Sequence, residues 1–329
     1  MGNRSLYAIV LAAGKGTRMK SGLPKVLHPL LGKPLVGHVI DLLNEVNISS
    51  IYLVLGHGAD KVKKELCYDN LTFVLQAEQL GTAHAVLCCK RYIDGVDGDC
   101  LIMCGDTPLF TKNTISLFIK EHFRNNSDLS ILSSFLSDPT GYGRILRDKD
   151  RKLIGIKEEK DASDVEKKIN EINTGCYIVN LRYLFNLLDE IDCNNAQGEY
   201  YLTDIVAKAL KKNLKVKAFP LADEVEAIGV NSRKQLAFAE SVLLERLRNI
   251  FMDRGVTFSI PSTTYLEPTV TIGQDVFIGP QCILKGNTVI RDRATIMGLC
   301  YIEDAVINEG EIVRPGTVKI NLSKERRSG

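Results

Sequence analysis

The chain has almost no excess charge of either sign. Its 42 lysine and arginine residues are balanced by 40 aspartate and glutamate residues, which leaves a formal net charge of +2 over 329 residues. A broad surface for nucleic acid or for an anionic membrane needs a much larger basic excess. We therefore expect no nucleic-acid partner and no membrane partner, and any anionic ligand has to be bound by a local site.

Long apolar segments and targeting signals are also missing. No apolar run approaches the ~18 residues that a membrane-spanning helix needs. The N-terminal stretch leads from a short basic start directly into a glycine-rich segment, without the apolar region and small-residue cleavage site of a signal peptide. These absences predict a cytoplasmic protein.

The nine cysteines and five histidines form no recognisable cluster. Nine is an odd number and no CxxC pair occurs, so a disulfide framework is not indicated. The histidines show no HxxxH spacing, which gives a zinc site little support. We expect the cysteines to be reduced core residues and the histidines to play no catalytic part.

The sequence does have the composition of a globular protein, with 45% hydrophobic and 25% charged residues. Its length exceeds the usual domain of about 100 to 200 residues, so we expect two units. Short apolar runs predict strands at 6–12, 51–55, 71–75, 100–104, 129–135 and 175–179. Helical spacing predicts helices at 35–46, 83–91, 114–123 and 203–210. This alternation indicates an α/β, Rossmann-like domain with a mostly parallel sheet covered on both faces, which binds its ligands at the carboxyl ends of the strands.

The C-terminal part of the sequence has a different period. A long helical pattern at 232–255, ended by Gly255, is the expected linker. Beyond it, aliphatic residues recur every six positions, and the positions four further on are small or compact. The first set is Leu266, Ile272, Ile278, Leu284, Ile290, Ile296 and Ile302, and the second is Val270, Val276, Cys282, Thr288, Ala294, Cys300 and Val306. These hexapeptides predict a short left-handed parallel β-helix of about three coils, followed by a solvated basic tail at 323–329. The expected domains are 1–231, 232–255 and 256–329.

A glycine-rich loop follows the first predicted strand, within LAAGKGTRMKSGLPK at 11–25. Gly14 and Gly16 allow the backbone to approach phosphate oxygens, while Arg18 and Lys25 supply positive charge. The GxxxxGK of a Walker loop, followed by Ser or Thr, is absent. Met19 stands where the dinucleotide fingerprint GxGxxG needs its third glycine, which disfavours a nicotinamide-dependent dehydrogenase. We interpret the loop as a polyphosphate-binding site.

Together with further segments, this loop resembles a known family. The segments are GHG (56–58), LQAEQLGTAHA (75–85), GDTPL (105–109), DPTGYGRI (138–145), EINTG (171–175), NNAQGEYYLTD (194–204) and GVN (229–231). In this order and spacing they are similar to the uridyltransferase half of the bifunctional family that combines N-acetylglucosamine-1-phosphate uridyltransferase and glucosamine-1-phosphate acetyltransferase. The resemblance covers residues 6–254 and the start of the β-helix. It implies that UTP and N-acetylglucosamine 1-phosphate react to form UDP-N-acetylglucosamine and pyrophosphate.

The resemblance also implies roles for individual residues. Asp106 and Asn231 are the implied ligands of Mg²⁺, and Asp106 follows an apolar strand, at the sheet edge where a hard cation finds oxygen. Arg18 and Lys25 are the implied catalytic cations. The implied substrate contacts are Leu11, Ala12, Ala13, Gly14, Gln76, Gly81 and Thr82 for the uridine, Gly143, Glu158 and Asn173 for the sugar, and also Gly105. A role for Thr82 as a polar helix cap stays open, as does a solvated charged loop around Glu158.

The implied reaction requires positioning and charge neutralisation. The attacking phosphate is already an anion, so neither a general base nor a covalent intermediate is expected. In the family, a much longer β-helix carries the acetyltransferase site and mediates trimerisation. With about three coils expected here, we predict no acetyltransferase activity and leave a homo-oligomer, such as a trimer, as an alternative.

Two other functions remain open at this point. One is a nucleotidyltransferase for a different sugar 1-phosphate or nucleotide, such as glucose 1-phosphate or dTTP. The other is a noncatalytic sugar-nucleotide-binding subunit. Loss of Lys25, Asp106 or Asn231 would have favoured the second function, and all three residues are present.

Overall fold

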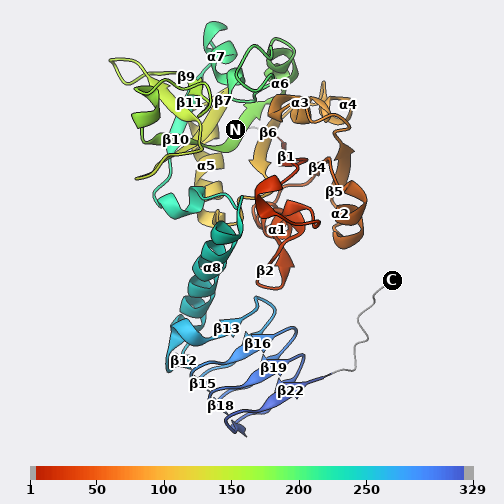
Figure 1. Ribbon diagram of the computed structural model, residues 1–329, viewed down its shortest axis with the longest axis vertical. Coiled ribbons are helices and arrows are strands. Elements are labelled where there is room, and N and C mark those ends of the chain that lie inside the picture. The colour runs from red at the N-terminus through yellow and green to blue at the C-terminus, as the bar shows by residue number, and fades with distance from the viewer. Residues whose placement is uncertain (1–4, 322–329) are drawn as a thin grey trace. The chain divides into compact units, whose positions relative to one another are not determined.

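The computed structural model describes residues 5–321 (Figure 1). They form two compact units, one of residues 5–28 and 34–235 and the other of residues 29–33 and 236–321. The predicted basic tail at 323–329 lies outside the described residues. All nine cysteines are free. Among residues 5–321, no helix is long and apolar enough to cross a membrane.

The first unit contains one large sheet that is mostly parallel. Its main path runs through β11 (Val216–Pro220), β7 (Leu129–Phe135), β10 (Glu171–Asn180), β6 (Asp99–Cys104), β1 (Leu6–Ala12), β4 (Ile51–Leu55) and β5 (Leu71–Leu75). β1 pairs in parallel with β4 and β6, β4 pairs with β5, and β7 pairs with β11. The α/β class and the six predicted strands are confirmed. Short apolar runs such as those of β1, β4 and β6 suit the interior of such a sheet, and β5 lies at its edge.

The strand β10 is antiparallel to both of its neighbours, β6 and β7. It also pairs with β8 (Arg144–Arg147), which forms an antiparallel hairpin with β9 (Leu153–Lys157). The register against β7 shifts between Asn173 and Cys176, where Gly175 has a φ of +79°. The first half of β10 was not predicted as a strand, because the residues before Gly175 are mostly polar and form no apolar run. Because Tyr177 pairs with Ile102, this first half continues past the carboxyl end of β6.

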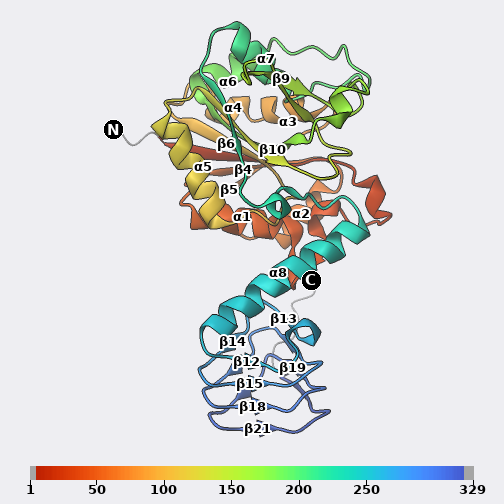
Figure 2. The same cartoon turned by 90° about the vertical axis from the view of Figure 1, so that its left-hand side faces the viewer.

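Helices cover both faces of this sheet (Figure 2). One face carries α3 (Thr82–Leu87), α4 (Lys90–Ile93), α6 (Leu181–Leu188) and α7 (Asp204–Lys211), and the other carries α1 (Leu35–Glu45), α2 (Ala59–Glu65) and α5 (Lys112–Arg124). β1 supplies both cores, with Ile9 on one face and Ala8 and Val10 on the other. The predicted helix at 83–91 is split in two, because the N–H of Cys89 bonds to the carbonyl of Val86, three residues back.

The second unit contains most of α8 (Arg233–Asp253) and a solenoid of short parallel strands. The strands form three parallel sheets. The first contains β12 (Thr257–Phe258), β15 (Phe277–Ile278), β18 (Thr295–Ile296) and β21 (Ile312–Val313). The second contains β13 (Tyr265–Leu266), β16 (Ile283–Lys285), β19 (Tyr301–Glu303) and β22 (Val318–Ile320), and the third contains β14 (Thr271–Ile272), β17 (Val289–Ile290) and β20 (Val306–Ile307). Residues 29–33 of this unit include β2 (Pro29–Leu30), which pairs with β3 (Lys33–Pro34). The three-sheet arrangement confirms a parallel β-helix.

The hexapeptide period holds as far as Ile302 and then shortens by one residue. The predicted repeat therefore fails at Val306, whose side chain is 45% exposed, whereas Ala305 and Ile307 are buried. The cause is a tighter turn after β19, in which Asp304 has a φ of +52°. Asp304 also accepts a hydrogen bond from the backbone N–H of Asn287, at 2.8 Å, in the preceding coil. The neighbouring strands therefore stay in register although one residue is missing.

Candidate functional site

Two adjoining cavities lie at the carboxyl ends of β1 and β6 in the first unit. The large cavity measures about 500 Å³ and the small cavity about 220 Å³. Both are lined by four of the same residues, namely Leu11, Thr82, Cys104 and Asp106. This is the edge of a parallel sheet where ligands are expected to bind.

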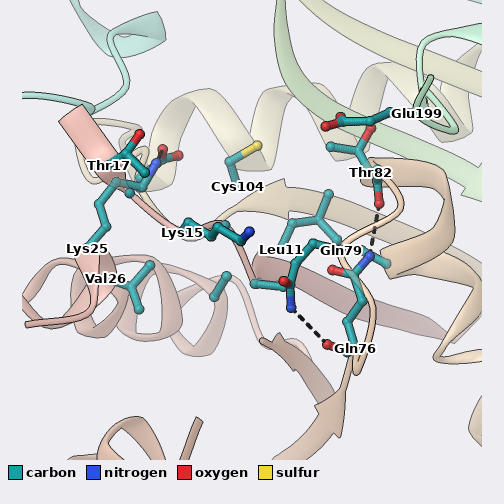
Figure 3. A pocket seen from close by; sticks show the side chains of 17 residues that line it. Leu11, Lys15, Thr17, Lys25, Val26, Gln76, Gln79, Thr82, Cys104 and Glu199 are labelled. Atoms are coloured by element: carbon teal, nitrogen blue, oxygen red, sulfur yellow. Dashed lines mark hydrogen bonds and ion pairs between the residues drawn. The ribbon is translucent and has the colours of Figure 1, made fainter. Parts of the chain in front are cut away.

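The large cavity is lined by the glycine-rich loop that follows β1 (Figure 3). Of the residues proposed from the sequence, it brings together Leu11, Ala12, Ala13, Gly14, Lys25, Gln76, Gly81, Thr82 and Asp106. Gly16 has a φ of +61°, and a Cβ there would lie 2.6 Å from Cβ of Lys25. The absence of this side chain therefore lets the loop turn closely around Lys25.

The far wall of the large cavity is a turn held by a second segment of the chain. The side-chain amide of Gln76 donates to the carbonyl of Gly81 at 3.0 Å, and its nitrogen lies 3.1 Å from Nδ1 of His84. Tyr200 donates its backbone N–H to the carbonyl of Leu80 at 2.8 Å and accepts from the N–H of Ala83 at 2.9 Å. These bonds fix the distance between Gln76 and the start of α3.

Thr82 is the first residue of α3 and does not cap this helix, because the N-cap position belongs to Gly81. Its hydroxyl oxygen instead accepts a hydrogen bond from the backbone N–H of Leu202, at 2.9 Å. The open alternative of a polar cap is therefore not what the structure shows. Thr82 contributes to the wall of both cavities.

Lys25, Asp106 and Asn231 meet where the two cavities adjoin. The ammonium group of Lys25 forms an ion pair with Oδ2 of Asp106 and donates to Oδ1 of Asn231 at 3.1 Å. The N–H of Val230 donates to the carbonyl of Asp106 at 2.8 Å, which holds the segment before Asn231 beside the end of β6. One carboxylate oxygen and one amide oxygen therefore converge on a single cation, although they are far apart in the sequence.

The small cavity brings together Gly143, Glu158, Asn173 and Asn231. Glu158 accepts a hydrogen bond from the hydroxyl of Thr203 at 3.0 Å. Burial away from water raises the pKa of its carboxyl group, while this hydrogen bond opposes the rise and the nearby carboxylates of Asp204 and Asp161 add to it. The side chain of Glu158 is thus part of the cavity wall, and not of a solvated loop.

Two sequence-proposed residues line neither cavity. Arg18 is exposed in the short 3₁₀ turn Thr17–Met19, and its charge partly opposes the burial that raises the pKa of Tyr142, a residue of the small cavity. Gly105 is buried, and a Cβ there would lie 3.3 Å from Cβ of Ala12 and from the carbonyl of Leu11. Gly105 therefore provides room for close packing behind the wall, one residue before Asp106.

Several cavity-lining residues were not among those proposed from the sequence. Gln79 and Glu199 line the large cavity, Tyr142 and Thr203 line the small one, and Cys104 lines both. All of them lie within or next to the segments that carry the family resemblance, so their position in the sequence could have identified them as candidates. Burial raises the pKa of the Cys104 thiol to about 12, so it stays protonated near neutral pH.

Comparison with known proteins agrees with this architecture. Residues 8–164 match a MobA-like NTP transferase domain. A crystal structure from Bacillus anthracis, named as a glucose-1-phosphate thymidylyltransferase, covers 72% of this chain and 95% of its own chain, with a TM-score of 0.57 and 21% identity. At this identity, the similarity supports the α/β fold alone.

Closer relatives match almost the whole chain. The bifunctional protein GlmU of Syntrophotalea carbinolica is 44% identical over 318 residues, which cover 97% of this chain and 68% of that protein. GlmU proteins of Listeria monocytogenes serotype 4a and Enterococcus faecalis are 43% and 42% identical over 95% and 97% of this chain, and over 68% and 69% of their own lengths. With this extent of similarity, the chain belongs to the GlmU family, and its catalytic class is that of a sugar-phosphate nucleotidyltransferase.

Proposed function

We propose that this protein joins N-acetylglucosamine 1-phosphate to the α-phosphate of UTP, forming UDP-N-acetylglucosamine and releasing pyrophosphate. The observation that supports this most directly is the meeting of the two cavities at Asp106. A nucleotide in the large cavity and a sugar phosphate in the small one would bring their phosphates together beside Lys25. The volumes and lining groups of the two cavities suit these two ligands.

Nucleotidyltransferases of this family use a divalent metal ion, and we propose Mg²⁺ held by Asp106 and Asn231. The fit rests on the two side-chain oxygens that converge on the Lys25 ammonium group, since such an arrangement suits a hard cation. No cluster of three or more His, Cys, Asp or Glu side chains suited to a metal occurs within residues 5–321. The remaining ligands would therefore be phosphate oxygens and water, as Mg²⁺ prefers. When bound, the ion offsets negative charge on the phosphates.

The residues of the chain position the reacting groups and neutralise charge. Backbone N–H groups of the glycine-rich loop and the ammonium group of Lys25 bind the triphosphate for in-line attack by a sugar-phosphate oxygen. As the new P–O bond forms, the bond to the pyrophosphate breaks. Lys25, which lines the large cavity, would offset the charge that develops there, and Arg18, from the exposed turn whose Thr17 lines that cavity, is proposed as the second cation. Cys104 lies close to this point, but its raised pKa argues against a thiolate nucleophile.

The large cavity also suggests how the base is selected. The amide nitrogen of Gln76 is already engaged by Gly81 and His84. Its carbonyl oxygen would then accept a hydrogen bond from N3–H of uracil, a proton that cytosine lacks. UTP should therefore be preferred over CTP.

The small cavity would bind the sugar through the backbone of Gly143 and the side chains of Glu158 and Asn173. Glu158 is an acceptor suited to sugar hydroxyls, and Asn173 can both donate and accept. Asn173 is fixed from behind, because its backbone N–H donates to the carbonyl of Gly143 at 2.8 Å. The two residues thus form one continuous wall.

Pyrophosphate release is the test. Purified protein would be incubated with UTP, Mg²⁺ and either N-acetylglucosamine 1-phosphate or glucose 1-phosphate, and with dTTP or CTP in place of UTP. We expect the acetylated sugar and UTP to react fastest. Faster release with glucose 1-phosphate or dTTP would keep the reaction and replace the substrate. No release with any sugar phosphate, from a protein that binds UTP, would favour a noncatalytic subunit.

The prediction that this chain transfers no acetyl group can be checked in the same preparation. Glucosamine 1-phosphate and acetyl coenzyme A would be added, and free coenzyme A would be measured. We expect no release above the rate without protein. A homo-oligomer also stays a prediction, for which light scattering of the purified chain is the measurement.

A further inference from the structure

Arg144 is a buried cation behind the wall of the small cavity. Its side chain is only 1% exposed, and Arg144 is not among the residues that line either cavity. The guanidinium group nevertheless contacts three separate segments, and two of them contribute residues to the small cavity. Resting on the function proposed above, we infer that Arg144 is a positioning residue that sets the affinity for the sugar phosphate without touching it.

The first contact is to the turn that forms one side of the small cavity. Nη1 of Arg144 donates to the backbone carbonyl of Tyr142, and Tyr142 and Gly143 both line the cavity. The carbonyl of Gly143 in turn accepts from the N–H of Asn173 at 2.8 Å. Arg144 therefore holds the turn from which one backbone sugar contact is proposed to come.

The second contact is to the residue after Glu158. Nη2 of Arg144 lies 2.7 Å from Oε2 of Glu159 in an ion pair, while Glu158 itself faces the cavity and bonds to Thr203. The adjacent carboxylates of Glu158 and Glu159 thus have separate partners. Because the ion pair anchors the side chain of Glu159, it also limits how far the adjacent Glu158 can shift.

The third contact is to the loop that follows. Nη2 of Arg144 also donates to the carbonyl of Lys167 at 3.2 Å. A planar guanidinium group can make these three contacts at once, whereas a lysine ammonium group on a flexible chain cannot match their geometry. A buried arginine that loses its partners, or a partner that loses the arginine, is also costly to the fold, so structural and functional effects have to be separated.

The same strand provides a matched control. Arg147 forms a bidentate ion pair with Glu171, at 2.6 and 2.7 Å, and Glu171 also accepts from Ser133 at 2.9 Å. Neither Arg147 nor Glu171 lines the small cavity. Replacing Arg147 therefore breaks an arginine–glutamate pair of β8 without releasing the Tyr142 turn or the Glu158 backbone.

The experiment measures steady-state kinetics of Arg144→Met, Arg144→Lys, Glu159→Gln and Arg147→Met with both substrates. For Arg144→Met we expect the KM for N-acetylglucosamine 1-phosphate to rise about tenfold or more and the KM for UTP to change less than about twofold. Arg144→Lys and Glu159→Gln should show smaller rises of the same kind, about threefold. Arg147→Met should leave both KM values within about twofold of wild type, whatever its stability.

A binding measurement gives a readout besides turnover. Calorimetry would compare UDP and UDP-N-acetylglucosamine, and the ratio of their affinities reports the sugar contacts alone. We expect this ratio to fall about tenfold in Arg144→Met and to stay at the wild-type value in Arg147→Met. If Arg144→Met does not fold, Arg144→Lys and Glu159→Gln carry the same comparison.

The outcomes separate the two ideas. An unchanged sugar KM in all Arg144 and Glu159 variants, or equal rises for UTP and sugar phosphate, would overturn the positioning role while the proposed function stands. A wild-type protein that releases no pyrophosphate with any sugar phosphate would overturn the proposed function, and the inference with it.

Discussion

Adjacent side chains at the end of β9 have opposite surroundings, and this difference decides what each can do. Glu158 faces the small cavity and is shielded from water, whereas Glu159 is paired with Arg144. A carboxylate without a cationic partner in such a place is a cost to the fold that a bound sugar can offset through its hydroxyl groups. Removing the charge of Glu158 should therefore increase the stability of the ligand-free protein and weaken the binding of the sugar phosphate.

Replacing Glu158 by Gln should stabilise the ligand-free protein at neutral pH. Burial raises the pKa of Glu158 above its ordinary value of 4.5, so the folded chain binds the proton to higher pH than the unfolded chain. Its ionisation therefore lowers stability as pH rises above that ordinary value. We expect Glu158→Gln to raise the Tm by about 2 °C at pH 7, with no difference below about pH 4, and to weaken sugar-phosphate binding about tenfold.

The control for this experiment has the opposite sign. Hydrogen bonds from the backbone N–H and the hydroxyl of Ser163, at 2.8 and 2.7 Å, lower the pKa of Glu166. Its stabilising effect is present above the ordinary carboxyl pKa and is lost as pH falls through the lowered value. Glu166→Gln should therefore lower the Tm at pH 7 and leave turnover unchanged. A Tm of Glu158→Gln below that of wild type at pH 7 would contradict our account of Glu158.

Asp106 should be needed for metal binding and for rate, but not for folding. The Asn variant keeps the shape of the side chain and removes the charge that faces Lys25. We expect Asp106→Asn to lose on the order of 10² to 10³ in kcat, the cost of one transition-state contact, and Lys25→Ala to lose a similar factor. Electron paramagnetic resonance should show weaker Mn²⁺ binding to Asp106→Asn in the presence of UTP. Normal turnover by either variant would remove these residues from the mechanism.

At the scale of elements, the start of α3 is set by backbone contacts to a distant segment. Gly81 has a φ of +115°, and a Cβ there would lie 2.5 Å from the carbonyl oxygen and 2.7 Å from the nitrogen of Tyr200. Backbone atoms cannot move aside as a flexible side chain can. The residue type at position 81 therefore determines whether the 200–202 segment can hold the wall of the large cavity.

Gly81→Ala should weaken both nucleotide binding and the fold. We expect a loss of about 1–3 kcal/mol of stability from backbone strain and contact, and UTP affinity reduced at least about tenfold. Gly95→Ala is the matched control, because Gly95 has a φ of +74° but open space around its Cβ position. The Gly95→Ala variant should lose about 1 kcal/mol of folding stability and bind UTP with wild-type affinity. Urea unfolding and calorimetry measure both quantities, and equal UTP affinity in the two variants would show that the Tyr200 contact is unimportant.

At the scale of the whole molecule, the two units have separate cores. The cores on the two faces of the large sheet share no residue with the core of the β-helix, which contains Ile296 and its inward-facing neighbours. A packing defect inside one unit should therefore affect that unit first.

Ile296→Ala should lower the stability of the β-helix by about 2–5 kcal/mol, since its side chain is fully buried. The adjacent Met297 is 48% exposed, and Met297→Ala should change stability by less than about 0.5 kcal/mol. Differential scanning calorimetry would follow unfolding, and UTP binding at 20 °C should be unchanged in both variants. Loss of UTP binding together with the defect in Ile296→Ala would show that the two units fold as one.

Local pattern was sufficient for most elements and for part of the site. Sequence patterns predicted the strands at 6–12 and 51–55, because each is a short apolar run. They also predicted the aliphatic positions from Leu266 to Ile302, because these recur every six residues. Gln76 and Asp106 could be placed through the segments around them. The first half of β10 could not be predicted as a strand from apolar pattern, because its polar residues have other partners: Glu171 pairs with Arg147, and Asn173 and Thr174 line the small cavity.

The α/β domain, the hexapeptide solenoid and the glycine-rich loop could be read from the sequence alone, since each depends on residues at short, regular spacing. The folded chain was needed to find that Arg144 contacts Tyr142 and Glu159, that Leu202 donates to Thr82, and that Asp106 and Asn231 converge on Lys25. These contacts join residues that are distant in sequence or carry no local structural preference. Which residues become partners therefore depends on how the whole chain folds, and local sequence patterns do not contain that information.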